Sequence, residues 1–293
     1  DRKDLDLIVN LIQENSGKDL YIRHAAIEAL TKFDAKTLGI LNNHNSVEVQ
    51  LCAVVALRRN KAPEIRRFLK AESDFVSTEA ALGIYDDFSI LPAMSYLAEA
   101  LESSDNNTTA FVLRAINANA RIGSFENAAR VAKWASDETQ SEEHRLFALK
   151  RLIEWNSPQK LDAVTGRYRS SQDSIAEFSS LRQALEPFIQ RLLVDGSAKV
   201  QAAAMHLSRK YDLLPSHEIL VRLIKQETTD ESVRIAALQA MADEKGVISN
   251  REVLREAINS NSSKLRVVAM QYLSAAEPNA LDTALGFLKS EKL

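Results

Sequence analysis

The sequence predicts an all-α protein in which about eight helix pairs stack into a solenoid with a right-handed superhelical path. Three observations lead to this prediction. A short pattern recurs eight times, at intervals of 27 to 36 residues apart from one interval of 56. Alanine occupies the same position in seven of the eight copies, and the chain has only 8 glycines and 6 prolines. A period of this length is typical of repeat architectures, and so few turn residues disfavour a strand-rich fold.

Each copy of the pattern predicts the second helix of a pair. Its first residue has a side-chain oxygen that can accept a hydrogen bond from the free N–H groups of a first helical turn. These first residues are Asp19, Ser46, Ser73, Thr109, Ser141, Ser197, Asp230 and Ser262. The seventh position after them holds Ala26, Ala53, Ala80, Ile116, Ala148, Ala204, Ala237 and Ala269. We expect this alanine column to be buried, because a small side chain lets a neighbouring helix approach closely.

Shorter amphipathic helices are expected between these copies. Pro63 and Pro92 fall in first-turn positions, where the missing N–H costs nothing. The expected helices span residues 5–14, 35–42, 63–71, 91–103, 125–136, 217–227, 251–259 and 279–290. No single pair could bury its apolar face alone, so stacking of the pairs supplies the core.

The interval of 56 residues is the one break in the repeat. We expect residues 1–293 to form a single solenoid with an insertion at about 157–173. The insertion contains Gly166, Arg167, Tyr168 and Arg169, and insertions in solenoids often carry binding. The alternative is a surface loop without a ligand. A long helix is expected from about residue 174, with a kink or break just before Pro187.

Composition narrows the classes of function. The formal net charge is −3 and the isoelectric point about 6.0, which argues against a general nucleic-acid binder. The single cysteine, Cys52, permits neither an intrachain disulfide nor a cysteine-rich metal site, and we expect it to be a small buried residue. No run of 18 apolar residues is present, so no membrane-spanning helix is predicted. The chain starts at Asp1 in what already looks like a helix, so we expect it to be a segment of a longer protein. If Asp1 and Leu293 are cut ends of the solenoid, we expect this segment to associate through an uncapped end.

The start of several second helices resembles the HEAT-repeat family of armadillo-like helical proteins. The resemblance rests on D-x-x-[VI]-R, present from Asp19 and again from Asp230, and it covers nearly the whole chain. The motif arginine is present as Arg23, Arg145, Arg234 and Arg266 and is replaced by Gln50, Ser77, Leu113 and Gln201. The resemblance implies that each arginine pairs with an aspartate of a neighbouring unit, in a ladder that is interrupted here.

A narrower resemblance involves the middle of the chain. The segments SDFVSTEAALGIYDD, FVLRAINANARIGSFENAARVAKWASDE and PQKLDAVTGRYR are similar to the HEAT region of large bacterial exported proteins. Those proteins have a sorbosone-dehydrogenase-like β-propeller before this region and a c-type cytochrome domain after it. The resemblance implies a periplasmic or exported location, whereas a free-standing adaptor would be cytoplasmic. The haem attachment pattern C-x-x-C-H is absent, since Cys52 is followed by Ala53 and Val54.

Motifs that carry chemistry are absent from the sequence. None of the five histidines is spaced with another as a metal-binding pair, and glycine-rich phosphate loops and nucleophile elbows are missing. These histidines are His24, His44, His144, His206 and His217. Asp86 and Asp87 are expected at a solvated helix end rather than as an acid–base pair. Trp134 and Trp155, on adjacent expected helices, are expected to contact each other in the core.

Basic residues late in the second helices predict a discontinuous positive stripe on the concave face. Such a stripe can hold acidic peptides or phosphates, although acidic residues at comparable positions, Asp86, Glu154 and Asp243, favour a merely solvated face. The residues predicted to bind a partner are Arg58, Arg59, Arg121, Lys150, Arg151, Arg167, Tyr168, Arg169, Arg209 and Lys210.

The function expected from the sequence is non-catalytic. We expect a protein-interaction scaffold, one module of a larger bacterial protein, that binds protein in cis or in trans and holds no cofactor. One alternative is a helical spacer of an exported haem-containing oxidoreductase. A second alternative is an enzyme on a HEAT fold, such as a DNA glycosylase or a bilin lyase, although the acidic isoelectric point disfavours nucleic acid as a partner.

Overall fold

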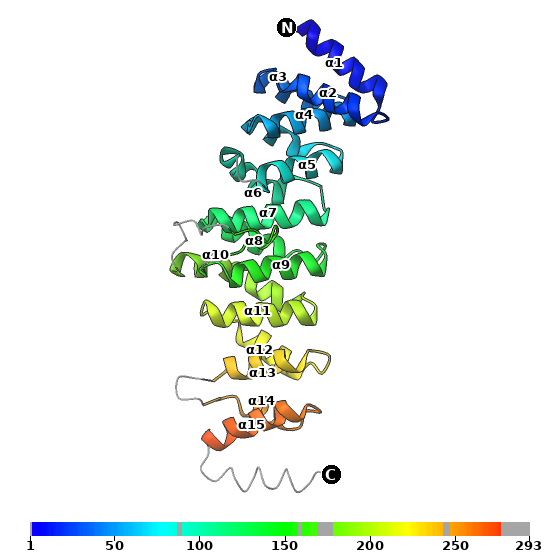
Figure 1. The fold of residues 1–293 in the computed structure, drawn as a ribbon. Coiled ribbons are helices and arrows are strands. Elements are labelled where there is room, and N and C mark those ends of the chain that lie inside the picture. The colour runs from blue at the N-terminus through cyan, green and yellow to red at the C-terminus, as the bar shows by residue number, and fades with distance from the viewer. Residues whose placement is uncertain (1, 87–89, 158–159, 169–177, 243–246, 277–293) are drawn as a thin grey trace. The chain divides into compact units, whose positions relative to one another are not determined.

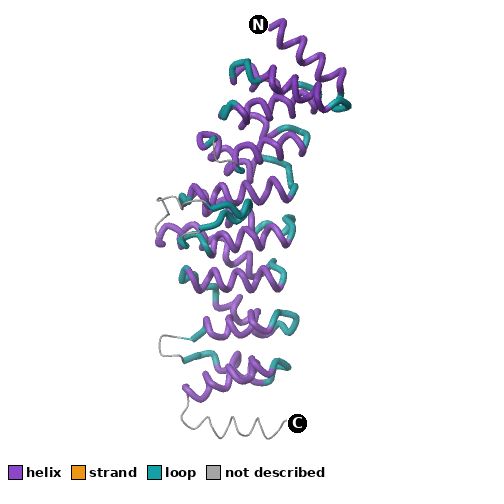
Figure 2. Tube along the Cα trace, in the orientation of Figure 1, coloured by secondary structure: helices purple, strands orange, loops and turns teal. Residues whose placement is uncertain are grey.

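The computed structural model describes residues 2–86, 90–157, 160–168, 178–242 and 247–276, and over these residues the protein is all-helical (Figures 1 and 2). The one exception to helices and loops in this part of the chain is an isolated antiparallel bridge between Leu161 and Tyr168. The chain divides into two compact units. The first comprises residues 1–134 and 154–177, and the second comprises residues 135–153 and 178–293.

In the first unit, the helices follow one another as alternating first and second members of pairs. Their bounds are α1 Arg2–Asn15, α2 Leu20–Leu30, α3 Ala35–Ile40, η1 Leu41–Asn43, α4 Val47–Arg59, η2 Pro63–Lys70, α5 Asp74–Tyr85, η3 Leu91–Ala93, α6 Met94–Ser103, α7 Thr109–Ile122 and α8 Phe125–Ala135, of which the last residue belongs to the second unit. The second helices of this unit, α2, α4, α5 and α7, contact one another in that order. Among the first helices, η2 contacts both α3 and α6, so the unit is built of two packed layers.

The second unit repeats this arrangement. Its helices are α9 Glu142–Ile153, α10 Phe178–Val194, α11 Ala198–Lys210, α12 His217–Lys225, α13 Glu231–Ala240, α14 Arg251–Ile258 and α15 Ser263–Ala276. The second helices α9, α11, α13 and α15 contact in succession, and the first helices α10, α12 and α14 do the same. The expected helix over 279–290 lies outside the described residues.

The alanine column is buried at every copy. Ala26 is 2% exposed, and the other seven positions, the isoleucine included, have no exposed surface. The capping residues also lie where the pattern predicts, and Asp19, Ser46, Ser197 and Asp230 accept backbone N–H groups of the following turn. One cap is corrected. Thr108, not Thr109, is the capping residue of α7, because Thr108 has extended backbone angles while Thr109 is already helical.

Several expected helices differ in detail from the observed ones. The segment Pro63–Lys70 is a 3₁₀ helix, and 3₁₀ turns also form η1 and η3 beside α3 and α6. The sequence predicts a kink or a break before Pro187, and the helix does not break there, because α10 continues through Pro187. Because Pro187 has no N–H, the carbonyl of Gln183 loses its helical partner. Pro187 and Gln183 are both exposed, while Leu185 and Ile189 are buried. Water can therefore replace the missing hydrogen bond, and packing holds the helix on both sides.

Two of the four motif arginines, Arg145 and Arg234, bond to backbone carbonyls of the preceding first helix. Arg145 Nε donates to Ala135 O at 2.8 Å, and Arg234 Nε donates to Ile224 O at 2.9 Å. Gln201, which replaces the arginine in α11, does the same through Nε2 to Leu193 O at 3.0 Å. The aspartate pairing implied by the resemblance is thus not the bond that these side chains make. Their bonds satisfy carbonyls that a helix end leaves without a partner.

Three residues singled out in the sequence are buried. Cys52 is 1% exposed, as expected for a small core residue. Trp134 and Trp155 are 8% and 5% exposed. Trp155 lies in the turn after α9 rather than on a helix, and its Nε1 donates to Gly123 O at 3.3 Å.

Candidate functional site

The insertion places one buried carboxylate, that of Asp162, against two helices of the first unit. Its Oδ2 accepts hydrogen bonds from the Tyr85 hydroxyl, from Asn117 Nδ2 at 3.3 Å and from Arg121 NH1 at 3.2 Å. The Asn117 amide also donates to the Tyr85 hydroxyl. Tyr85 is the last residue of α5, and Asn117 and Arg121 lie one turn apart in α7. We call Tyr85, Asn117 and Arg121 the carboxylate receptor.

The local sequence explains how the insertion presents Asp162. Its Oδ1 accepts the backbone N–H groups of Val164 at 3.0 Å and Thr165 at 2.8 Å, and the Thr165 hydroxyl at 3.0 Å. Aspartate favours such turns because its short side chain can bond to the backbone two or three residues ahead. Gly166 follows with a φ of 68°, a conformation that glycine adopts without a steric cost. The turn therefore uses one carboxylate oxygen and leaves the other for the receptor.

A second contact ties the insertion to the end of α5. Arg167 NH1 donates to Asp86 O at 3.3 Å. The Asp86 carboxylate accepts both Arg114 Nε at 2.7 Å and Arg114 NH2 at 2.9 Å, a bidentate pair between α5 and α7. Asp86 is therefore an interhelical ion-pair partner rather than a solvated helix end, and Asp87 lies outside the described residues.

Electrostatics keep this cluster in one protonation state near neutral pH. Burial, the hydrogen bond to Asp162 and its negative charge raise the pKa of the Tyr85 hydroxyl. Burial alone would raise the pKa of Asp162, but hydrogen bonds from Tyr85, Thr165 and Val164 outweigh it and lower that pKa. Tyr85 therefore stays protonated as a donor and Asp162 stays ionised as an acceptor. This arrangement binds a carboxylate and leaves no free base for proton transfer.

This ionisation predicts an acid-sensitive tie between the insertion and the first unit. A carboxylate whose folded pKa is lowered stabilises the contact above its unfolded pKa and loses it as pH falls through the folded pKa. We expect the amide chemical shift of Thr165, which bonds Asp162, to titrate with a midpoint below the ordinary aspartate value of 3.8. A midpoint above 3.8 in the NMR titration would contradict the hydrogen-bonded carboxylate.

The predicted partner-binding residues of the first unit are largely engaged within it. Arg58 pairs with Glu79 at 3.5 Å, and Arg59 pairs with Glu28 at 2.9 Å. Arg121 belongs to the carboxylate receptor, and its side chain is 13% exposed. From the insertion, Tyr168 is 74% exposed, Arg167 bonds the end of α5, and Arg169 lies outside the described residues.

In the second unit the predicted basic residues divide into exposed and engaged ones. Lys150 of α9 and Arg209 of α11 are exposed, on two helices that contact each other. Arg151 is buried and lies over the ring of Phe147 at 5.5 Å. Lys210 Nζ donates to Ile153 O, and burial lowers the pKa of its ammonium group. Of the four predicted basic residues in this unit, Lys150 and Arg209 are therefore the two exposed to solvent.

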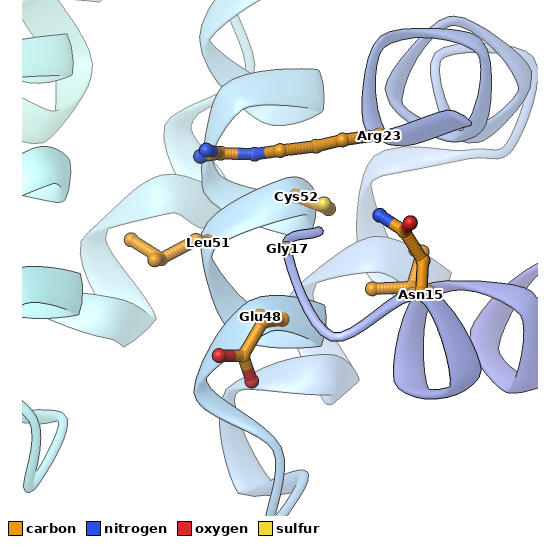
Figure 3. A pocket seen from close by; sticks show the side chains of 7 residues that line it. Asn15, Gly17, Arg23, Glu48, Leu51 and Cys52 are labelled. Carbon is orange, nitrogen blue, oxygen red and sulfur yellow. The ribbon is translucent and has the colours of Figure 1, made fainter. Parts of the chain in front are cut away.

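A pocket of about 130 Å³ lies beside the turn between α1 and α2 (Figure 3). It is lined by Ile12, Asn15, Gly17, Arg23, Glu48, Leu51 and Cys52. Figure 3 shows Cys52 between the side chains of Arg23 and Glu48. Burial raises the pKa of the Cys52 thiol, which keeps it protonated and a poor nucleophile. Small-molecule sites usually enclose about 300–1,000 Å³, so this pocket is too small for a typical ligand.

Comparison with known proteins gives no further guide to the site. No protein-family model matches the chain, and no curated protein matches it significantly. Within the described ranges, no group of three or more histidine, cysteine or acidic residues could hold a metal ion. Across the same ranges, no helix is long and apolar enough to cross a bilayer.

Sequence reasoning missed three members of the cluster. Asp162, Tyr85 and Asn117 were not predicted as site residues, although Arg121 was. The available signal was the turn sequence from Asp162 to Gly166, in which a threonine and then a glycine stand three and four residues after the aspartate. That signal predicts a turn, but it does not say which helices receive the remaining carboxylate oxygen.

Proposed function

We propose that this chain is a HEAT-like solenoid module that binds protein segments, in cis or in trans, and that it is not itself an enzyme. The observation that carries the proposal is the alanine column, buried at all eight copies, combined with second helices that contact in succession within each unit. Stacked helix pairs of this kind present extended surfaces suited to binding other chains.

Two further observations support binding over catalysis. Lys150 and Arg209 are exposed on neighbouring second helices, where they can attract an acidic segment of a partner. In the first unit, Tyr85 stays protonated and donates a hydrogen bond to Asp162, which stays ionised. A pair whose protonation states do not change near neutral pH suits recognition better than acid–base chemistry.

Site-specific cross-linking tests this proposal. A photo-cross-linking amino acid would replace His206, which is exposed on the second helix α11, or Glu218, which is exposed on the first helix α12. We expect one recurring protein cross-link in expressing cells from position 206 and not from 218. The double charge reversal K150E/R209E should weaken that cross-link by about tenfold, because it replaces attraction by repulsion.

The matched control reverses two charges elsewhere in the same unit. Arg222 and Arg255 are exposed on the first helices α12 and α14, and R222E/R255E should leave the cross-link unchanged. Equal yields from positions 206 and 218, or equal loss in both double variants, would contradict a binding face on the second helices. Salt-sensitive cross-linking to DNA instead would favour an enzyme acting on nucleic acid.

A further inference from the structure

In the described part of the insertion, residues 160–168, Asp162 is the side chain that enters the first unit, and Arg167 adds a hydrogen bond to the end of α5. Within residues 160–168, Asp162 alone is buried, with a side-chain exposure of 0%. The larger apolar side chains of the segment stay in solvent, since Leu161 is 59% and Tyr168 is 74% exposed. Residues 160–168 therefore bury little apolar surface, and their described contacts with the first unit are the hydrogen bonds of Asp162 and Arg167.

The receptor presents three different donors to one oxygen. The hydroxyl of Tyr85, the amide of Asn117 and the guanidinium of Arg121 all reach Oδ2 of Asp162. Hydrogen bonds to an ionised acceptor are roughly twice as strong as neutral ones, and a cation among the donors favours a charged ligand over an amide. The donor set is therefore chemically specific for a carboxylate.

The shape of the ligand is also defined. Oδ1 of Asp162 is occupied by the backbone of its own turn, at Val164 and Thr165, so only Oδ2 faces the receptor. An aspartate in such a turn presents one carboxylate oxygen from a backbone that is already ordered. Preorganised ligands bind more tightly because less conformational entropy is lost on binding.

We propose that Tyr85, Asn117 and Arg121 form a receptor for an aspartate presented in a tight turn. Asp162 occupies this receptor in cis, and an aspartate in an acidic turn of a protein partner takes the place of Asp162. This deepens the proposed function, on which it rests, by naming the chemistry of the partner segment. The tether gives Asp162 a high effective concentration, so an external turn competes only when Asp162 is removed or when additional contacts of the partner compensate.

A peptide-binding experiment on the full chain tests the receptor directly. The probe is a fluorescent peptide with the sequence of residues 160–168, added to the full-length variant D162A, whose receptor is vacated. We expect the peptide to bind D162A and to bind the unsubstituted chain about tenfold or more weakly, because Asp162 competes in cis. Replacing the peptide's aspartate by asparagine should weaken binding to D162A by about tenfold or more.

The matched control removes an aspartate from a similar turn in the second unit. Asp137 Oδ1 accepts the backbone N–H of Thr139 at 3.0 Å and its hydroxyl at 2.8 Å. D137A should bind the peptide as weakly as the unsubstituted chain does. In the D162A background, R121Q should abolish binding, because it removes the cationic donor.

Three outcomes would overturn the proposal. They are no peptide binding to a D162A chain that still unfolds cooperatively, equal binding of the aspartate and asparagine peptides, and equal binding to D162A and the unsubstituted chain. If D162A fails to unfold cooperatively, D162N replaces it in the same assay, because the amide keeps the shape of the carboxylate. The peptide is supplied directly, so this result is independent of the cellular cross-linking that tests the proposed function.

Discussion

Replacing Ala26 by leucine is expected to lower the free energy of unfolding by about 1–3 kcal/mol, the usual cost of inserting extra methylenes into a packed core. Ala26 belongs to the alanine column, is 2% exposed, and lies on α2, which contacts both α1 and α4. A leucine there must displace a neighbouring helix or adopt a strained rotamer. Urea unfolding of the full chain, followed by far-ultraviolet circular dichroism, measures the change.

The adjacent residue provides the control for this prediction. Ala25 is exposed on the same helix, so A25L should change the free energy of unfolding by less than about 0.5 kcal/mol. Both variants add the same side chain to the same helix and differ only in the direction it points. Equal destabilisation by A25L and A26L would mean that the alanine column does not set the spacing between helices.

Replacing Arg234 by alanine is the second substitution with a large expected effect. Arg234 is 5% exposed, and its Nε donates to Ile224 O at 2.9 Å. Without this donor, the carbonyl at the end of α12 loses its partner beneath α13. Leaving a buried acceptor without a hydrogen bond costs about 1–3 kcal/mol. We expect R234A to lower the free energy of unfolding by that amount in the same urea experiment.

Glutamine should rescue most of this loss. Gln201 occupies the equivalent position in α11 and reaches Leu193 O at 3.0 Å, and Gln50 in α4 reaches His44 O at 2.6 Å. R234Q should therefore be less destabilising than R234A by about 1 kcal/mol, the net value of a typical hydrogen bond. If R234Q proved as unstable as R234A, the positive charge rather than the donated hydrogen bond would stabilise this position.

The helical organisation was predictable because its signals are local. Each copy of the pattern lies within one helix and its cap, as with the capping Ser46 and the buried Ala53 seven positions later in α4. The pattern can therefore be recognised without reference to the rest of the chain. Local signals are less decisive where tertiary surroundings matter. A kink or a break was predicted before Pro187, and α10 does not break there because its exposed side lets water replace the lost hydrogen bond.

The carboxylate receptor was not predictable from the sequence because its members are far apart in the chain. Tyr85 and Asp162 are separated by 77 positions and share no periodic pattern. Arg121 was predicted as part of a positive stripe, since periodicity shows that a late helical position faces outward but does not show what covers it. In the folded chain, the insertion covers it and its charge is paired with Asp162.

The first unit is interrupted in the chain, since residues 154–177 return to it after residues 135–153 have contributed to the second unit. During translation, α5 and α7 are synthesised well before Asp162. Tyr85, Asn117 and Arg121 can bond Asp162 only after α9 has been synthesised, so the first unit is completed only when part of the second has been made. A nascent chain stalled near residue 135 would therefore expose the receptor to whatever acidic turn it meets.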